Sequence, residues 1–268
     1  SIERAKNRLS IFFDQDGNED YAEARFGLCS ASRMELNQLI GKSDESLEVD
    51  EGTAFKVNML LKRLPRLRSG ACSSEEAFAG TFHFNEGYSQ MQDSYNDSVR
   101  GMMPVIPPGE TYCHSLSDPS ILSGELQSQG FHTLTLFGLD MPYRLFEQDN
   151  EKARSIALER YLASLNQYLE DSIEDCLAID ANGQLCIEAM SAVDLFEKIH
   201  LPKGNIFHGG LSWPFAETNE EVGQWGVETE FPNLYLCGSS ARRGGAVSGI
   251  PGYNAAKKVL QSVTSTNL

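Results

Sequence analysis

Cations, long apolar stretches and paired cysteines are scarce in this chain, and each scarcity disfavours a class of protein. The 268 residues include 22 Lys and Arg against 38 Asp and Glu, a net charge of -16. A field of that sign repels nucleic acid and anionic membrane surfaces. The sequence has no run of eighteen apolar residues, about the length that a membrane-spanning helix requires. We therefore expect no nucleic-acid partner and no integral membrane segment.

The cysteines follow no metal-binding or redox pattern. They are Cys29, Cys72, Cys113, Cys176, Cys186 and Cys237. The absence of a C-x-x-C pair and of a matching histidine spacing argues against a zinc site and a thioredoxin-type disulfide. We interpret them as mostly buried thiols of an intracellular protein. The amino-terminal segment SIERAKNRLSIFF lacks the apolar stretch and cleavage site of a secretory signal. The expectation is a soluble, cytoplasmic protein without a bound metal.

Alternating apolar and polar residues predict several strands. The segment 21–32 alternates and then runs apolar, as a strand that enters a packed sheet does. Ser30 or Ser32 could cap the short helix RMELNQLIG that follows. The segment TAFKVNMLLKRLPRL has apolar residues at every second position from Phe55 to Leu61, which predicts a strand with one buried face. Two further strands are expected in PVIPPGETYCHSLSDPS and GFHTLTLFGLDMPY.

Apolar residues three or four positions apart predict helices. The clearest spans 151–173, and shorter ones are expected over 191–201, capped by Ser191, and over 248–261, with Pro251 in the first turn. In FNEGYSQMQDSYNDSVRG one apolar face is expected to pack against the rest of the protein: Tyr88, Met91, Tyr95 and Val99. Strands and helices alternate without a clean period, which favours an α/β or mixed α+β fold.

The segment NLYLCGSSARRGGAVSGIPGYNAA, residues 233–256, contains an apolar strand, a turn of small residues and a helix start in that order. Small residues let a backbone approach a ligand closely. The free N–H groups at the start of the helix favour a phosphate or an electron-rich ring edge. The segment is not a P-loop, and it lacks the G-x-G-x-x-G spacing. These residues alone leave two interpretations open, a cofactor cradle and a ligand-free turn.

This segment resembles the closing motif of the phytoene-desaturase-like family of FAD-dependent oxidoreductases, in particular a branch named for a pyridine nucleotide-disulfide oxidoreductase domain. GNIFHGGLSWPFAE, residues 204–217, resembles a second motif of that branch, and PPGETYCHSLSDPSILSGE resembles part of its substrate-binding region. The resemblance implies a remnant of the FAD-binding domain in residues 1–50. It implies a substrate-binding domain with a mixed sheet and helices in 51–203. Residues 204–268 would form the closing strand-turn-helix segment of a Rossmann-like FAD-binding domain.

The activity that this resemblance implies is that of a desaturase or dehydrogenase, which passes a hydride from a substrate C–H bond to the flavin. The substrate would be apolar or another small molecule. The implied FAD contacts are Cys237, Gly238, Ser239, Gly244, Gly245, Ala246 and Val247. His208 and Trp213 are candidates for the substrate site, and the other histidines show no ligand spacing.

Two departures from the family pattern stand out in the closing motif. Arg242 and Arg243 occupy the place of His-Pro, and Ala246 that of a third glycine. The arginine pair could neutralise a phosphate, meet an acidic substrate or lie in solvent.

The amino-terminal G-x-G-x-x-G unit, which supplies most of the FAD site in that family, does not occur in the 268 residues. We therefore expect the chain to be the truncated, carboxy-terminal half of an active flavoprotein and to be inactive as a fragment. Two alternatives stay open. One is an amine-oxidase-like flavoenzyme, and the other is a non-catalytic interaction module without bound flavin.

Overall fold

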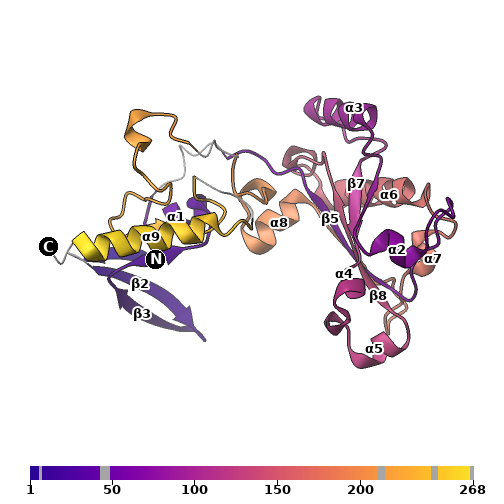
Figure 1. The fold of residues 1–268 in the computed structure, drawn as a ribbon, viewed down its shortest axis with the longest axis horizontal. Helices are drawn as coiled ribbons and strands as arrows, with labels where there is room; N and C mark the ends of the chain where they lie inside the picture. The colour runs from indigo at the N-terminus through magenta and orange to yellow at the C-terminus, as the bar shows by residue number, and fades with distance from the viewer. Residues whose placement is uncertain (6–7, 43–48, 211–214, 243–246, 266–268) are drawn as a thin grey trace. The chain divides into compact units, whose positions relative to one another are not determined.

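The chain forms two compact units. The computed structural model describes residues 1–5, 8–42, 49–210, 215–242 and 247–265. One unit, here called the split unit, consists of residues 1–50 and 200–268, and the other, the central unit, of residues 51–199 (Figure 1). Both contain strands and helices, which confirms the mixed α/β class. None of the helices in the described residues is long and apolar enough to cross a membrane.

The central unit is built on a five-stranded antiparallel sheet. In spatial order its strands are β6 (Thr81–Phe84), β7 (Gly109–Tyr112), β8 (His132–Gly138), β5 (Phe55–Leu61) and β9 (Ile187–Met190). Along β5, buried and half-buried residues alternate, as the period-two pattern predicts. The fully buried positions of β5 and β8 belong to one continuous core.

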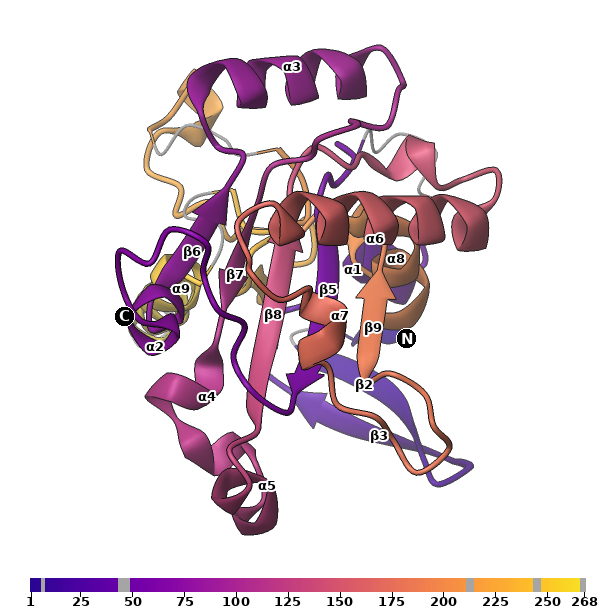
Figure 2. The same ribbon diagram turned by 90° about the vertical axis from the view of Figure 1, so that its right-hand side faces the viewer.

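Helix α6 (Asn150–Asn166) runs across one face of this sheet (Figure 2). Its Tyr161 is fully buried and stacks on Phe55 with ring centroids 5.3 Å apart. The Tyr161 hydroxyl donates a hydrogen bond to the Leu139 carbonyl at 2.6 Å. A Cβ at Gly138 would lie 2.2 Å from the Tyr161 ring, so the close packing of this ring requires glycine there.

The helix predicted over 151–173 is shorter in the structure. The Asn166 side-chain oxygen accepts the Ile173 N–H at 2.8 Å, which holds the segment between them in a turn. A second helix, α7 (Ile173–Cys176), begins after it, and Ser172 caps it by accepting the Asp175 N–H. The short helices of the central unit include α2 (Ser74–Phe78), α4 (His114–Ser117), α5 (Gly124–Ser128) and the 3-10 turns η1 (Pro119–Ile121) and η2 (Tyr143–Leu145).

Helix α3 (Tyr88–Val99) forms where the sequence predicts it, but a different, neighbouring face of the helix is buried. Ser94 and Ser98 are buried, and the Arg144 guanidinium donates to the Ser98 carbonyl near the end of the helix. The expectation that its apolar face packs inward is wrong, because Tyr88, Met91, Tyr95 and Val99 are all exposed. Figure 2 shows α3 beyond the end of the sheet that α6 covers.

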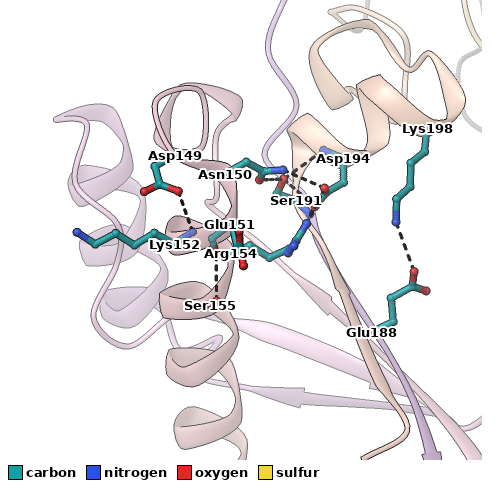
Figure 3. Close-up of polar contacts among 10 residues, drawn as sticks. All are labelled: Asp149, Asn150, Glu151, Lys152, Arg154, Ser155, Glu188, Ser191, Asp194 and Lys198. Carbon is teal, nitrogen blue, oxygen red and sulfur yellow. Dashed lines mark hydrogen bonds and ion pairs between the residues drawn. The ribbon is translucent and has the colours of Figure 1, made fainter. Parts of the chain in front are cut away.

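A buried polar cluster joins α6 to α8 (Ala192–Ile199) (Figure 3). The Asp194 carboxylate accepts hydrogen bonds from the Asn150 amide at 2.9 Å, from Arg154 at 2.7 Å and from the Ser191 N–H at 2.8 Å. Ser191 accepts the Asp194 N–H in return, which confirms it as the helix cap. Burial opposes ionisation of Asp194, but these hydrogen bonds outweigh it and hold its pKa below the ordinary value.

The split unit begins with an antiparallel meander of β1 (Ile2–Ala5), β2 (Arg8–Gln15) and β3 (Asn18–Ala24). Asp16 and Gly17 join β2 to β3 with φ angles of 55° and 82°, which fits a type I′ turn. The single strand predicted over 21–32 is wrong, because the chain leaves the meander after β3 and starts a strand of another sheet at Gly27.

That second sheet of the split unit is a parallel pair, β4 (Gly27–Cys29) and β10 (Leu234–Leu236). Helix α1 (Arg33–Leu39) follows β4, and α9 (Ile250–Ser265) lies on the carboxyl side of β10. Ser32 caps α1 by accepting the Glu35 N–H at 3.1 Å. Two 3-10 turns, η3 (Pro202–Gly204) and η4 (Asn219–Glu221), precede β10. The core of the unit comprises nine buried residues that include Leu9, Leu36, Leu234, Leu236 and Ala255.

Candidate functional site

The carboxyl ends of β4 and β10 form the first candidate site. Leu234 pairs with Gly27 and Leu236 with Cys29, and the Cys237 N–H continues the ladder to the Cys29 carbonyl at 2.8 Å. Since the strands are parallel, both chains leave the sheet at the same edge. In open α/β sheets this edge is where ligands bind.

The two turns that leave this edge contact one another. The Arg33 N–H, at the start of α1, donates to the Ser240 hydroxyl at 2.6 Å. A Cβ at Gly238 would lie 2.6 Å from the Ser30 carbonyl oxygen. The close approach that Gly238 permits in this structure is therefore to the backbone of the other turn. Ser30 and Ser240 belong to the site's framework. Sequence reasoning did not assign them to it, because Ser30 meets Gly238 and Ser240 meets the Arg33 N–H, and each contact joins segments about 200 residues apart.

Helix α9 begins beside this edge, where a Cβ at Gly252 would lie 3.8 Å from the Cys237 carbonyl oxygen. Ile250 and Pro251 form its first turn, as the sequence predicts. The Ile250 N–H reaches the Ser248 hydroxyl at 3.3 Å. A helix of 16 residues presents a partial positive charge at this end, which favours an anionic group.

The predicted cofactor contacts fall into three groups. Cys237, Gly238 and Ser239 lie half-buried in the turn after β10. Val247 lies before α9, and its side chain is fully exposed. Gly244, Gly245 and Ala246 lie outside the described residues.

The two thiols at the ends of the strands are held neutral by their surroundings. Burial raises the pKa of Cys29 and that of Cys237. A thiol with a raised pKa is a poor nucleophile at neutral pH. The cysteines of this edge therefore act as small apolar groups rather than as reactive thiolates.

Arg242, one of the two arginines that depart from the family pattern, pairs with acids of the same unit. Its guanidinium forms ion pairs with Glu217 and with Glu221, the latter at 2.9 Å. The backbone N–H of Arg242 donates to the Gly226 carbonyl. These contacts engage Arg242 with carboxylates from the segment before β10. Arg243 lies outside the described residues.

His208 lies in a tight loop, with a φ of 63°. Asn205 organises this loop by accepting the Phe207 N–H at 2.9 Å and donating its amide to the Asp50 and Gly209 carbonyls. The Nδ1 atom of His208 is buried and has no hydrogen-bond partner among the described residues. Burial lowers the His208 pKa, so the imidazole is neutral at pH 7. Trp213, the other substrate candidate, lies outside the described residues.

The central unit holds a separate pocket of about 570 Å³ on the half-buried face of its sheet. Its walls are mainly apolar and include Leu60 on β5 and the partly exposed Ile121 and Leu185. Polar side chains also line it, namely Asn58, His114, Thr133, Thr135 and Glu188. The Thr135 hydroxyl donates to the Asn58 side-chain oxygen at 3.4 Å. A mainly apolar pocket with a few polar groups is typical of a small-molecule site.

Curated relatives of this chain are known in bacteria and mammals. It is 45% identical over 254 residues to uncharacterized protein Mb0921c of Mycobacterium bovis and to uncharacterized protein Rv0897c of Mycobacterium tuberculosis, covering 93% of this chain and 47% of each relative. It is 28% identical over 222 residues to pyridine nucleotide-disulfide oxidoreductase domain-containing protein 2 of Mus musculus, covering 78% of this chain and 35% of that protein. No protein-family model matches the chain.

The mycobacterial proteins are the more similar of these relatives, the mammalian ones are distant, and all of them are longer than this chain. The similarity to the mouse protein, and at 27% to its Rattus norvegicus counterpart, supports a relationship with an oxidoreductase-like family. The chain spans about half the length of the mycobacterial relatives and about a third of the mammalian ones.

Proposed function

We propose that this chain is the carboxy-terminal part of a FAD-dependent oxidoreductase of the desaturase or dehydrogenase type. In this proposal the segments 1–50 and 204–268 contribute to the flavin-binding domain, and residues 51–203 form the substrate-binding domain. When bound, FAD would accept a hydride from a substrate C–H bond. The residues of the chain would hold the flavin, orient the substrate and exclude water.

The observation that carries this proposal is the parallel pair β4–β10, with two strand-turn-helix connections at one edge. Gly238 and Ser240 fix the two turns against each other through Ser30 and the Arg33 N–H. The partial positive charge at the start of α9 would attract a phosphate oxygen of a dinucleotide. The backbone of 237–239 and 244–247 would then contact the cofactor, as the family resemblance implies.

The size of the parallel pair supports a larger flavin domain. Each strand has three residues, and Leu28 in β4 is 55% exposed. Parallel sheets are normally covered on both faces, and two short strands alone are marginally stable in water. Relatives about twice as long have enough additional residues to complete such a sheet.

The substrate in this proposal is a mainly apolar molecule that carries at least one hydrogen-bonding group. The pocket of the central unit offers the apolar side chains of Leu60, Ile121 and Leu185. The Asn58 and Thr135 side chains would hydrogen-bond a hydroxyl or carbonyl of the substrate. His208, neutral and with an unpartnered Nδ1, is a candidate for a hydrogen bond to substrate or cofactor.

The decisive experiment is the visible absorbance of the protein purified from its complete reading frame, before and after incubation with FAD. The proposal predicts the visible absorbance bands of an oxidised, protein-bound flavin. A colourless protein that takes up no FAD would overturn the proposal and favour the interaction module.

A matched pair of variants makes this experiment specific to the closing segment. Val247→Glu and Val222→Glu each place a carboxylate on an exposed side chain of the split unit, because Val247 is fully exposed and Val222 is 71% exposed. Only Val247→Glu lies where the flavin is proposed, so it alone should lower FAD occupancy, by repulsion of the cofactor phosphates. Equal occupancy in the two variants would contradict the placement.

The reaction type is tested by a substrate panel. Apolar polyenes, alcohols and primary amines are compared by anaerobic bleaching of the flavin absorbance. Reduction by C–H donors without nitrogen supports a desaturase or dehydrogenase. Reduction by amines alone favours the amine-oxidase-like alternative.

A further inference from the structure

Three side chains of types that bind metals, His83, Glu86 and Glu110, meet at one edge of the sheet of the central unit. They do not line the 570 Å³ pocket of that unit, and they lie far in sequence from the proposed flavin segment. His83 lies on β6 and Glu110 on β7, directly opposite each other in the antiparallel register. Glu86 follows β6 in the turn that leads into α3. The sheet and this turn bring together residues whose positions in the sequence match no metal-binding spacing.

The donor atoms of these three residues face one another. The His83 Nδ1 atom lies 2.6 Å from Glu86 Oε2 and 3.5 Å from Glu110 Oε2. One donor atom from each residue lies within 4.8 Å of the other two. Two ligands that share a Zn²⁺ ion at about 2.0 to 2.2 Å lie roughly 3 to 3.5 Å apart. The His83–Glu110 separation falls in this range, whereas the His83–Glu86 distance is that of a hydrogen bond and would lengthen by about 0.4 to 0.9 Å if the two residues shared an ion.

The charge of the cluster is incompletely balanced. Within the described residues, neither Glu86 nor Glu110 forms an ion pair with a lysine or arginine, so His83 is their only potential cation. The Tyr112 hydroxyl donates a hydrogen bond to the second oxygen of Glu110 and brings no positive charge to the cluster.

The Glu86 carboxylate also has an unused acceptor. Its Oε1 atom is buried and has no hydrogen-bond partner in the described part of the chain. A buried carboxylate oxygen without a partner is costly, and a cation within reach of the same carboxylate relieves that cost. This second observation concerns an atom that the His83 contacts do not satisfy.

We propose that His83, Glu86 and Glu110 bind a divalent cation of the Zn²⁺ class through one imidazole nitrogen and two carboxylate oxygens. Imidazole and carboxylate together suit Zn²⁺ better than Mg²⁺ or Ca²⁺, which prefer oxygen ligands alone. The three protein ligands leave at least one position for water. The ion joins β6 and β7 to the turn before α3, and this proposal does not depend on flavin binding.

The competing explanation is a protonated His83 held between two carboxylates, without a metal. Isothermal titration of the chelator-treated 268-residue chain with ZnCl₂ distinguishes the two. The proposal predicts one Zn²⁺ per chain, bound at least about tenfold more weakly by His83→Ala and by Glu110→Gln. Far-UV circular dichroism of each variant checks that it is folded.

The matched control is His200→Ala. The His200 imidazole also contacts a carboxylate, with Nδ1 3.3 Å from Glu35, but within the described part of the chain it pairs with no second one. This variant should bind Zn²⁺ like the wild type. Failure of the wild type to bind, or equal affinity in all three variants, would overturn the proposal, since binding to the free cysteines would survive every substitution.

A second readout keeps the test independent of calorimetry. Zn²⁺ should raise the thermal midpoint of the wild-type chain and of His200→Ala, because a ligand that binds only the folded state stabilises it. Glu110→Gln should show no rise at the same Zn²⁺ concentration. A rise of equal size in Glu110→Gln would contradict the site.

Discussion

The central unit and the split unit bury their sheets to different extents. Five antiparallel strands of the central unit share one core, in which Phe55, Phe146 and Tyr161 are fully buried. The parallel pair of the split unit has three residues in each strand, and Leu28 within it is 55% exposed. The difference indicates that the central sheet has its own complete core on one face, whereas the parallel pair has the form of a sheet that needs further cover.

The largest effect is expected from Tyr161→Ala in the core of the central unit. Loss of a fully buried aromatic ring leaves a cavity and costs about 3 to 5 kcal/mol of unfolding free energy. The sequence of the central unit, 51–199, contains no tryptophan, and Trp225 packs against the core of the split unit, so tryptophan fluorescence does not report the central core. Urea unfolding followed by circular dichroism should shift to lower urea, while the fluorescence transition stays in place.

Tyr161→Phe serves as the control for that experiment. It keeps the ring on Phe55 and removes only the hydrogen bond to the Leu139 carbonyl, a loss of about 1 to 2 kcal/mol. If tryptophan fluorescence shifts as far as circular dichroism in Tyr161→Ala, the two units unfold together and the comparison fails.

The reciprocal prediction concerns Leu36→Ala in the split unit. Leu36 is 1% exposed, and its truncation should cost about 2 to 4 kcal/mol. The fluorescence transition should move, and the circular dichroism change from the central unit should not. Leu39→Ala on the same helix is the matched control, because Leu39 is 37% exposed and its loss should have a small effect.

Asp194→Asn tests the polar cluster of the central unit. The substitution weakens the contacts to Arg154, Asn150 and the Ser191 N–H. It should lower the unfolding free energy near pH 7 by about 1 to 3 kcal/mol, as measured by urea unfolding. Glu188→Gln is the control, because the Glu188 pair with Lys198 is exposed and contributes little. If both variants lost the same unfolding free energy, burial would not be what makes the Asp194 contacts more stabilising than the exposed Glu188 pair.

The same variant has a defined pH dependence. The folded-state pKa of Asp194 lies below its unfolded value, so its stabilisation is present above the unfolded pKa of about 3.9 and is lost as pH falls through the folded pKa. The difference in unfolding free energy between wild type and Asp194→Asn should therefore shrink below about pH 4. A difference that stays constant down to pH 2 would contradict this assignment.

The smallest expected effect is that of Leu28→Ser. Its side chain is exposed in this chain, so the substitution should change the unfolding free energy by less than about 0.5 kcal/mol. In a longer protein whose additional strands cover β4, the same change should cost about 1 to 2 kcal/mol. Denaturant titrations of both proteins make this comparison, and equal small effects would argue against cover over β4.

Local patterns predicted the elements whose sequence and environment agree. Strand β5 follows its period-two pattern, and Ser32 and Ser191 cap α1 and α8 as their positions indicate. The fold class was predictable as well, because the helix and strand periods on which it depends are set by residues close together in the sequence. The dipeptide Asp16-Gly17 is a strong signal for a type I′ hairpin turn. It indicates that the residues after it pair back as β3, which the prediction of one strand over 21–32 overlooked.

Contacts between distant residues account for the errors and omissions. The apolar residues of α3 do follow a helical spacing, but the helix buries the face that carries Ser94 and Ser98 instead. Arg144, from a distant part of the sequence, donates to the Ser98 carbonyl. The turn of β10 meets the turn of β4 through Ser240 and the Arg33 N–H. No local period encodes such a contact, and the predicted FAD contacts at 237–239 and 247 remain a prediction.

By itself, the sequence determined the scarcity of cations, the lack of long apolar runs, the main periodic elements and the small-residue segment after β10. These properties depend on composition and on spacing over a few residues. Only the tertiary structure decided that this segment lies beside the turn at Ser30, that α3 exposes its apolar face, and that His83 faces Glu110 across two strands. Strand pairing and side-chain packing join residues far apart in the chain, and the free energy that selects them is a property of the whole fold.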